Sequence, residues 1–174
     1  KECYAAGEYT KAYQLLEELI IVMKGYDRGE ESLFMLSMCY YYLNDYETAA
    51  IYLDRYVKSY PKGEYTELAR FYSGKALYQQ SPDPRLDQAP TYTAINMLQD
   101  FLDYYPYSDK REEADNMIYD LQDRLVQKEY DNALLYYNLG EYNGNCHYGG
   151  NNFEASILTA ENALKTFPYT RLRE

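Results

Sequence analysis

The fold is decided by residues 33–61, which read LFMLSMCYYYLNDYETAAIYLDRYVKSYP. The small residues Ser37 and Ala49 let two helices approach closely, and large apolar residues recur around them at three- and four-residue steps. Asn44 and Asp45 mark a turn, because both residue types favour turn conformations. Pro61 ends the second helix, since proline has no backbone N–H to donate. The stretch therefore predicts two packed helices joined by a short turn.

The same spacing recurs in three further parts of the chain. An upstream copy lies 37 residues earlier and contains Gly7, Tyr9, Ala12 and Leu16. Two downstream copies contain Ala94, Leu98, Phe101 and Pro106, and then Ala160, Ala163 and Pro168. This spacing is similar to that of the tetratricopeptide repeat. The sequence predicts an all-α fold, an α-solenoid of about four tetratricopeptide-like helical pairs.

The later copies depart from the regular pattern. A helix is expected from about Tyr65 to Tyr78, followed by a loop at Ser81–Pro84, because prolines 82 and 84 cannot lie inside a helix. The apolar pattern from Lys110 to Leu139 predicts one long helix in the C-terminal half, or two nearly continuous ones. Gly140–Asn152 is rich in Gly and Asn and is expected to form an extended loop, with Asn152 as N-cap of a last helix from Phe153. We interpret residues 1–174 as one array, with N-terminal repeats at 1–80 and C-terminal repeats at 90–174.

Charge and composition exclude several classes of partner. The 174 residues carry a formal net charge of −11, which argues against nucleic acid and against an anionic membrane surface. The longest apolar stretch, Leu19–Met23, is far shorter than the roughly 20 residues of a membrane-spanning helix. We expect any membrane attachment to lie outside these residues. The three cysteines show no CxxC spacing, and we interpret them as unpaired, with a Cys3–Cys39 pair as the open alternative.

Residue types that carry chemistry are sparse. His147 is the one histidine, which excludes zinc sites built on two imidazoles, and Cys146 beside it has no other ligand at metal-binding spacing. The sequence contains no GxxxxGK[ST] or GxGxxG phosphate-binding motif. Neighbouring acids such as Glu112 and Glu113 point in different directions on a helix, so they do not form an acid–base pair. We expect a protein that is not an enzyme and that needs no metal or cofactor.

The surface of a helical-repeat array is then the expected working part. The first helix of each pair lines a concave groove in such arrays. In the second pair the residues not needed between the helices include aromatic and methionine side chains, and neighbouring pairs extend the set. The candidate groove residues are Tyr4, Phe34, Met38, Tyr41, Tyr42, Tyr72 and Lys75. Two interpretations stay open: packing against neighbouring helices, or a groove for an extended, aromatic-bearing peptide.

Several motifs resemble the BamD family, the lipoproteins of the outer-membrane β-barrel assembly machinery. They are Tyr60-Pro61-Lys62-Gly63 with Ala69, the loop Ser81-Pro82-Asp83-Pro84-Arg85-Leu86-Asp87-Gln88, Ala94-Ile95, Phe101-Leu102 through Tyr105-Pro106, Leu135-Tyr136-Tyr137 through Tyr142, and Ala163-Leu164-Lys165 through Pro168. The resemblance covers nearly the whole chain and looks closest to the Bacteroidetes branch. It implies a protein on the periplasmic face of the outer membrane, anchored by a lipidated cysteine upstream of Lys1. Cys3 lies inside the repeat pattern and is not assigned that role.

The resemblance also implies two working surfaces. The N-terminal repeats would hold unfolded outer-membrane β-barrel proteins, at the groove described above. The C-terminal repeats would dock on the POTRA domains of a BamA-like protein, and other Bam lipoproteins could join the complex. The docking candidates are Tyr130, Tyr137, Tyr142, Arg171 and Arg173. The insertion Asn143–Asn151 departs from the family pattern and puts this contact set in doubt.

Two other functions remain as alternatives. The first is a general tetratricopeptide adaptor that joins soluble proteins of the cell envelope. The second is a glycan-capturing helical-repeat lipoprotein, which the absence of tryptophan argues against. A lipid-attachment signal upstream of Lys1 would favour the assembly-machinery interpretation over the adaptor.

Overall fold

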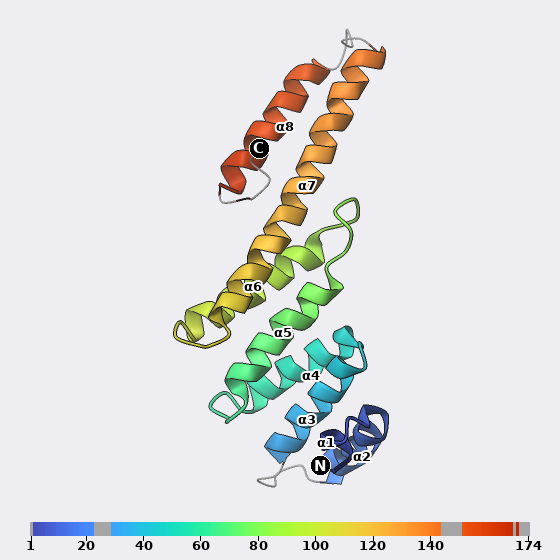
Figure 1. Ribbon diagram of the computed structural model, residues 1–174, viewed down its shortest axis with the longest axis vertical. Coiled ribbons are helices and arrows are strands. Elements are labelled where there is room, and N and C mark those ends of the chain that lie inside the picture. Colours follow the sequence, from blue (N-terminus) through green and yellow to red (C-terminus); the bar gives the residue numbers. More distant parts are fainter. Residues whose placement is uncertain (1, 23–28, 144–150, 169, 171–174) are drawn as a thin grey trace.

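The computed structural model describes residues 2–22, 29–143, 151–168 and 170, and every regular element in them is a helix. The helices are α1 (Glu2–Ala5), α2 (Tyr9–Val22), α3 (Gly29–Tyr42), α4 (Tyr46–Ser59), α5 (Thr66–Gln80), α6 (Ala89–Tyr104), α7 (Arg111–Asn143) and α8 (Asn152–Thr166). Each helix contacts the next one along the chain, and the array is elongated, with α1 near one end and the α7–α8 hairpin at the other (Figure 1). The predicted all-α solenoid of tetratricopeptide-like pairs is confirmed.

Within each of the first two helical pairs, the same kind of turn joins the first helix to the second. Gly7 and Asn44 both have positive φ, 75° and 63°. The N–H of Gly7 donates to the Tyr4 carbonyl at 3.1 Å, and the N–H of Asn44 donates to the Tyr41 carbonyl at 3.1 Å. Glycine and asparagine tolerate this left-handed conformation better than other residues. The internal repeat seen in the sequence is therefore also a repeat of backbone geometry.

Three second helices end in the same way. The residue before each proline is the C-cap, with φ and ψ of −131° and 68° at Tyr60, −130° and 65° at Tyr105, and −122° and 70° at Phe167. Each cap N–H still donates to the carbonyl four residues earlier. A residue that precedes proline is pushed out of the helical region. The sequence correctly placed the ends of these helices at the three prolines.

The core is a chain of three hydrophobic clusters along the solenoid. The positions predicted from the repeat are fully buried in the second and third pairs: Ala49, Leu53, Tyr56, Ala94, Leu98 and Phe101 are all 0% exposed. Tyr72 packs against two neighbouring clusters and links them. The fourth copy differs, because Ala163 is buried while Ala160 is exposed. Ala160 was wrongly included among the packing positions.

The long helix is longer than the sequence suggests. Helix α7 is continuous through Asn143, so the prediction that an extended loop starts at Gly140 is wrong. Gly140 packs against the Phe153 ring, where an added Cβ would lie 2.9 Å from ring atoms, and this contact explains a glycine inside the helix. Asn151 caps α8 by accepting from the N–H groups of Phe153 and Glu154. The predicted cap, Asn152, is instead the first helical residue.

Candidate peptide-binding surface

Five tyrosines from four helices make a continuous aromatic surface, which we call the tyrosine track. Its members are Tyr4 of α1, Tyr9 of α2, Tyr41 and Tyr42 of α3, and Tyr72 of α5. Tyr9 stacks on Tyr42 with ring centroids 4.6 Å apart, and Tyr4 meets Tyr42 edge-on at 6.5 Å. Tyr41 meets Tyr42 at 5.8 Å and Tyr72 at 5.2 Å. The structure thus brings four of the seven predicted groove residues into one connected set.

The track keeps part of its aromatic surface exposed. Tyr42 is 43% exposed, while Tyr4, Tyr41 and Tyr72 are half-buried. Rings that are packed on one side and open on the other are held at low entropic cost and can still contact a ligand. Phe34 and Met38 lie differently, because they are 9% and 2% exposed inside the second core cluster. The packing interpretation fits these two residues, and the structure gives them no open surface.

Lys75 lies at the α5 end of the track. Its Nζ is 2.6 Å from Glu113 Oε1 on α7 and 5.8 Å from the centroid of the Tyr72 ring. Burial, the largest single influence, lowers the pKa of Lys75, but the hydrogen bond to Glu113 and the charge interactions with Tyr41, Glu113 and Tyr72 together raise it above the ordinary value. Lys75 is therefore a charged residue that joins α5 to α7. It flanks the track with a cation whose charge is already paired.

Three of the track tyrosines have a raised pKa. Burial is the largest cause that raises the pKa of Tyr4, Tyr41 and Tyr42 above the ordinary value of 10.0. Neutral phenols can donate to and accept from peptide groups, while their rings offer apolar contact. The surface suits a chain with free backbone polar groups and aromatic side chains, and it adds no charge of its own.

Tyr9 and Tyr46 are not among the groove candidates predicted from the sequence. In the structure Tyr9 belongs to the track, and Tyr46 meets Tyr41 edge-on at 5.4 Å. These two tyrosines occupy equivalent positions of the first two repeats. Comparing repeats for aromatic residues at the start of the second helix would have found both.

The α7–α8 hairpin carries the candidate docking residues that the structure describes. Tyr130 is 60% exposed and Tyr137 is 45% exposed. The Tyr137 hydroxyl donates to Glu141 Oε1 at 2.9 Å, and its ring meets Phe153 at 5.7 Å. Further exposed apolar side chains surround them: Leu134, Leu135, Leu139, Ile157, Leu158 and Leu164. The side chain of Tyr142, together with Arg171 and Arg173, lies outside the described residues.

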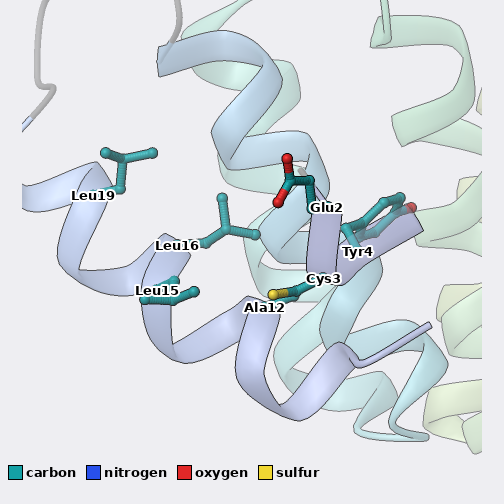
Figure 2. Close-up of a pocket in the computed structure, with 7 residues that line it drawn as sticks. All are labelled: Glu2, Cys3, Tyr4, Ala12, Leu15, Leu16 and Leu19. Carbon is teal, nitrogen blue, oxygen red and sulfur yellow. The ribbon is translucent and has the colours of Figure 1, made fainter. Parts of the chain in front are cut away.

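An open hollow of about 380 Å³ lies at the other end of the array, between α1 and α2. Figure 2 shows its lining residues, among them Leu15, Leu16 and Leu19 of one face of α2, with Cys3 opposite. Leu15 and Leu19 are 59% and 41% exposed. Their repeat equivalents in α4 are covered by α3, which is three turns longer than the described α1. Cys3 and the buried Cys39 are both free thiols.

Two kinds of feature are absent from the described part of the chain, namely membrane-spanning helices and clusters of metal-binding side chains. Within the described ranges, no helix is long and apolar enough to cross a membrane. The same ranges contain no group of three or more His, Cys, Asp or Glu side chains placed to hold a metal ion. Cys146 and His147 lie outside those ranges. That the chain is not an enzyme and needs no cofactor stays a prediction.

Comparison with known proteins identifies the family. No curated protein matches the chain. The model of the YfiO family, described as outer membrane lipoprotein, matches residues 1–170. The match spans all eight helices and both candidate surfaces up to residue 170. This chain therefore belongs to the YfiO family of outer membrane lipoproteins.

Proposed function

We propose that this protein is a non-catalytic scaffold of the outer-membrane β-barrel assembly machinery, with a role like that of BamD. It binds unfolded outer-membrane β-barrel proteins and docks on the POTRA domains of a BamA-like partner. Membership of an outer membrane lipoprotein family supports the location at the outer membrane. The observation that carries the binding role is the tyrosine track, which runs across α1, α2, α3 and α5 without a break.

The chemistry of the track matches that of its proposed client. A strand of a β-barrel alternates its side chains with a period of two, so an unfolded strand can turn every second residue to one surface. Aromatic residues are common in such strands near the membrane interface. An aromatic pair contributes about 0.5–1.5 kcal/mol beyond simple burial. A few such contacts would hold a client without trapping it, as a protein that passes clients onward requires.

The α7–α8 hairpin is the proposed docking surface. Tyr130, Leu134 and Tyr137 recur at four- and three-residue steps, so they lie along one side of α7. A surface with this many exposed apolar residues is typical of a protein–protein interface. On this proposal the hairpin, from about Tyr130 to Arg173, contacts the POTRA domains. On the same proposal a lipid anchor holds the protein at the periplasmic face, and other Bam lipoproteins could bind elsewhere.

The binding role is tested with a fluorescent 15-residue peptide from the C-terminal strand of a barrel protein, with aromatic residues at alternate positions. Tyr41→Ala with Tyr42→Ala removes two rings from the centre of the track. We expect binding, measured by fluorescence anisotropy, to weaken about tenfold or more, which corresponds to at least about 1.4 kcal/mol.

The matched control replaces two exposed tyrosines away from the track, Tyr92→Ala with Tyr107→Ala, which are 52% and 99% exposed. This control should bind the peptide as the unchanged protein does. Circular dichroism establishes that both variants keep their helices. Equal binding by the track variant and the unchanged protein would refute the groove and shift support to the general adaptor.

A further inference from the structure

A second open groove lies beside the middle of α7, where the loop between α5 and α6 approaches that helix. It has a volume of about 480 Å³. The loop contributes Pro84 and Arg85, and α7 contributes Lys128, Asp131, Asn132, Leu134, Leu135 and Asn138. We call it the loop–helix groove. It contains none of the tyrosine track, and it shares Leu134 and Leu135 with the exposed apolar side chains of the α7–α8 hairpin.

The loop wall of this groove is fixed in place by hydrogen bonds. Lys128 Nζ donates to the Leu86 carbonyl at 2.9 Å, and Arg124 donates to the Ser81 carbonyl at 3.2 Å. Gln88, only 3% exposed, donates through its Nε2 to the carbonyls of Asp83 and Leu86 at 2.8 and 3.2 Å. A partner would therefore meet a preformed wall and would lose little energy to ordering it.

The groove lies on the side of α7 that faces away from α8. Two contacts identify the side of α7 that packs on α8. The Ala133 carbonyl accepts from the Ser156 hydroxyl at 2.8 Å, and Gly140 packs against the Phe153 ring. Lys128, Asp131, Leu135 and Asn138 recur at three- and four-residue steps about half a turn away from that side. Leu135 is 56% exposed and Leu134 is 43% exposed.

Elsewhere in the array such a side is covered by a helix. Helix α3 contacts both α2 and α4, and α5 contacts both α4 and α6. The cluster that joins α5 and α6 to α7 ends at Leu121. Beyond it, the loop of residues 81–88 lies beside α7 (Figure 1) and is held there by Arg124 and Lys128. Among the described residues, no helix packs on this side of the second half of α7, whereas α8 packs on the other side.

The charges in the groove indicate what can fill that position. Neither Arg85 nor Lys128 forms an ion pair within 4.0 Å among the described residues. Asp131 already accepts from Gln127 at 2.9 Å. In a chain of net charge −11, two unpaired cations beside exposed leucines favour a ligand with carboxylates next to apolar side chains.

We propose that the loop–helix groove binds an amphipathic, acidic helix of a partner protein. The helix packs along Lys128–Asn138, a length of about 15 Å or three helical turns. Its apolar side covers Leu134 and Leu135, and its carboxylates pair with Arg85 and Lys128. This is recognition of a helix in a groove, on a side of α7 that no described helix covers. The inference does not use the tyrosine track. It shares Leu134 and Leu135 with the hairpin proposed to dock on the POTRA domains, but Arg85 and Lys128 lie outside that hairpin surface, so the charge variants test it separately.

The probe for this groove is taken from the chain itself. Residues 89–104, the sequence of α6, form an amphipathic helix that carries Asp100 and Asp103 and no basic residue. In the array α6 packs on the first half of α7. A fluorescent peptide of this sequence, stapled between the exposed positions 92 and 96 to hold it helical, is titrated into the whole protein. Two comparison peptides carry lysine at positions 100 and 103, or a central proline in an unstapled chain.

The variants separate charge from apolar contact, each with a control at a similarly exposed position. Arg85→Glu tests charge, because no hydrogen bond of the Arg85 side chain holds the loop within the described residues; its control is the exposed Arg55→Glu of α4. Leu135→Ser tests apolar contact; its control is Ile51→Ser, at a side chain that is 62% exposed.

We expect saturable binding of the acidic helix that weakens at least tenfold with Arg85→Glu and with Leu135→Ser, and changes less than twofold in the two controls. The lysine peptide should bind the Arg85→Glu variant more tightly than the unchanged protein. Absence of saturable binding to the unchanged protein would overturn the proposal. Equal weakening in the controls, or equal binding of the proline peptide, would overturn it as well.

Discussion

Glu30 links three segments of the array. Although it lies near the surface, we expect Glu30→Ala to destabilise the fold strongly. Its Oε1 accepts from the Tyr56 hydroxyl at 2.6 Å and from the Glu64 N–H at 2.8 Å. The Tyr56 oxygen in turn accepts from the Tyr65 N–H at 3.2 Å. The site is tightly packed, since a Cβ on Gly63 would lie within 3 Å of both the Glu30 carboxylate and the Tyr56 hydroxyl. These bonds join the start of α3 to the end of α4 and the turn before α5.

The size of the effect follows from these bonds. Hydrogen bonds to a charged group contribute about 1.5–3 kcal/mol each, and a buried hydroxyl left without a partner costs about 1–3 kcal/mol. Tyr56 is 0% exposed, but Glu64 is exposed and regains water when its partner is lost. We therefore expect Glu30→Ala to lower the free energy of unfolding by about 2–4 kcal/mol. In a chain of this size that lowers Tm by about 5–15 °C.

Urea unfolding of four variants measures this effect. Glu30→Gln keeps an oxygen acceptor without the charge and should lose about half as much stability. In the Tyr56→Phe background, Glu30→Ala should cost at least about 1 kcal/mol less than it does alone, because one of the bonds is already gone. The control is Glu161→Ala, at an exposed position of α8. If Glu30→Ala changed stability by no more than the control does, the reasoning from this contact network would be refuted.

Three further predictions follow from packing and titration. Burial is the largest cause that raises the pKa of Tyr40 above 10.0. The contribution of the protonated Tyr40 hydroxyl to folding stability is therefore complete below pH 10 and is lost as the pH rises through the folded-state pKa. Tyr40→Phe should make the urea midpoint fall less steeply above pH 10, and an unchanged slope would contradict this. Gly74→Ala places a Cβ 2.7 Å from Leu98 Cδ2, and overpacking of about 1–3 kcal/mol should exceed the gain of about 1 kcal/mol in helix propensity; a more stable variant in urea would show the reverse. Gly140→Ala places a Cβ 2.9 Å from the Phe153 ring and should speed amide hydrogen exchange in α8 relative to α4, whereas unchanged exchange would mean that this contact does not hold the hairpin.

The sequence predicted those parts of the fold that local chemistry determines. Gly7 and Asn44 tolerate the left-handed turn conformation, and the prolines at 61 and 106 push the residue before them out of the helical region, so the helix boundaries followed from them. Buried positions such as Leu53 and Leu98 followed from repetition. Gly140 was wrongly predicted to start a loop, because its place in α7 depends on contact with the Phe153 ring of α8. Composition favours a turn there, while packing favours a helix.

The candidate site was predicted less well than the fold. Helix α3 is apolar around most of its circumference, so its pattern alone does not tell which residues face the core. Phe34 and Met38 are buried by α4 and α5, and Tyr41 and Tyr42 of the same helix are not. In the structure Tyr72 of α5 lies against Tyr41, and Lys75 lies near the Tyr72 ring. Their pairing with Tyr41 and Glu113 depends on the stacking of separate helices, which the sequence does not specify.

The central claim is that the protein works inside the outer-membrane assembly machinery. The most direct test is affinity purification of the full-length protein, tagged at its C-terminus, from envelope extracts, with the copurifying proteins quantified by mass spectrometry. The account predicts a barrel protein with POTRA domains in stoichiometric amount, and its loss when Tyr130 and Tyr137 of the hairpin are both replaced by Ala. Recovery of soluble envelope proteins without any POTRA-containing partner would contradict the account.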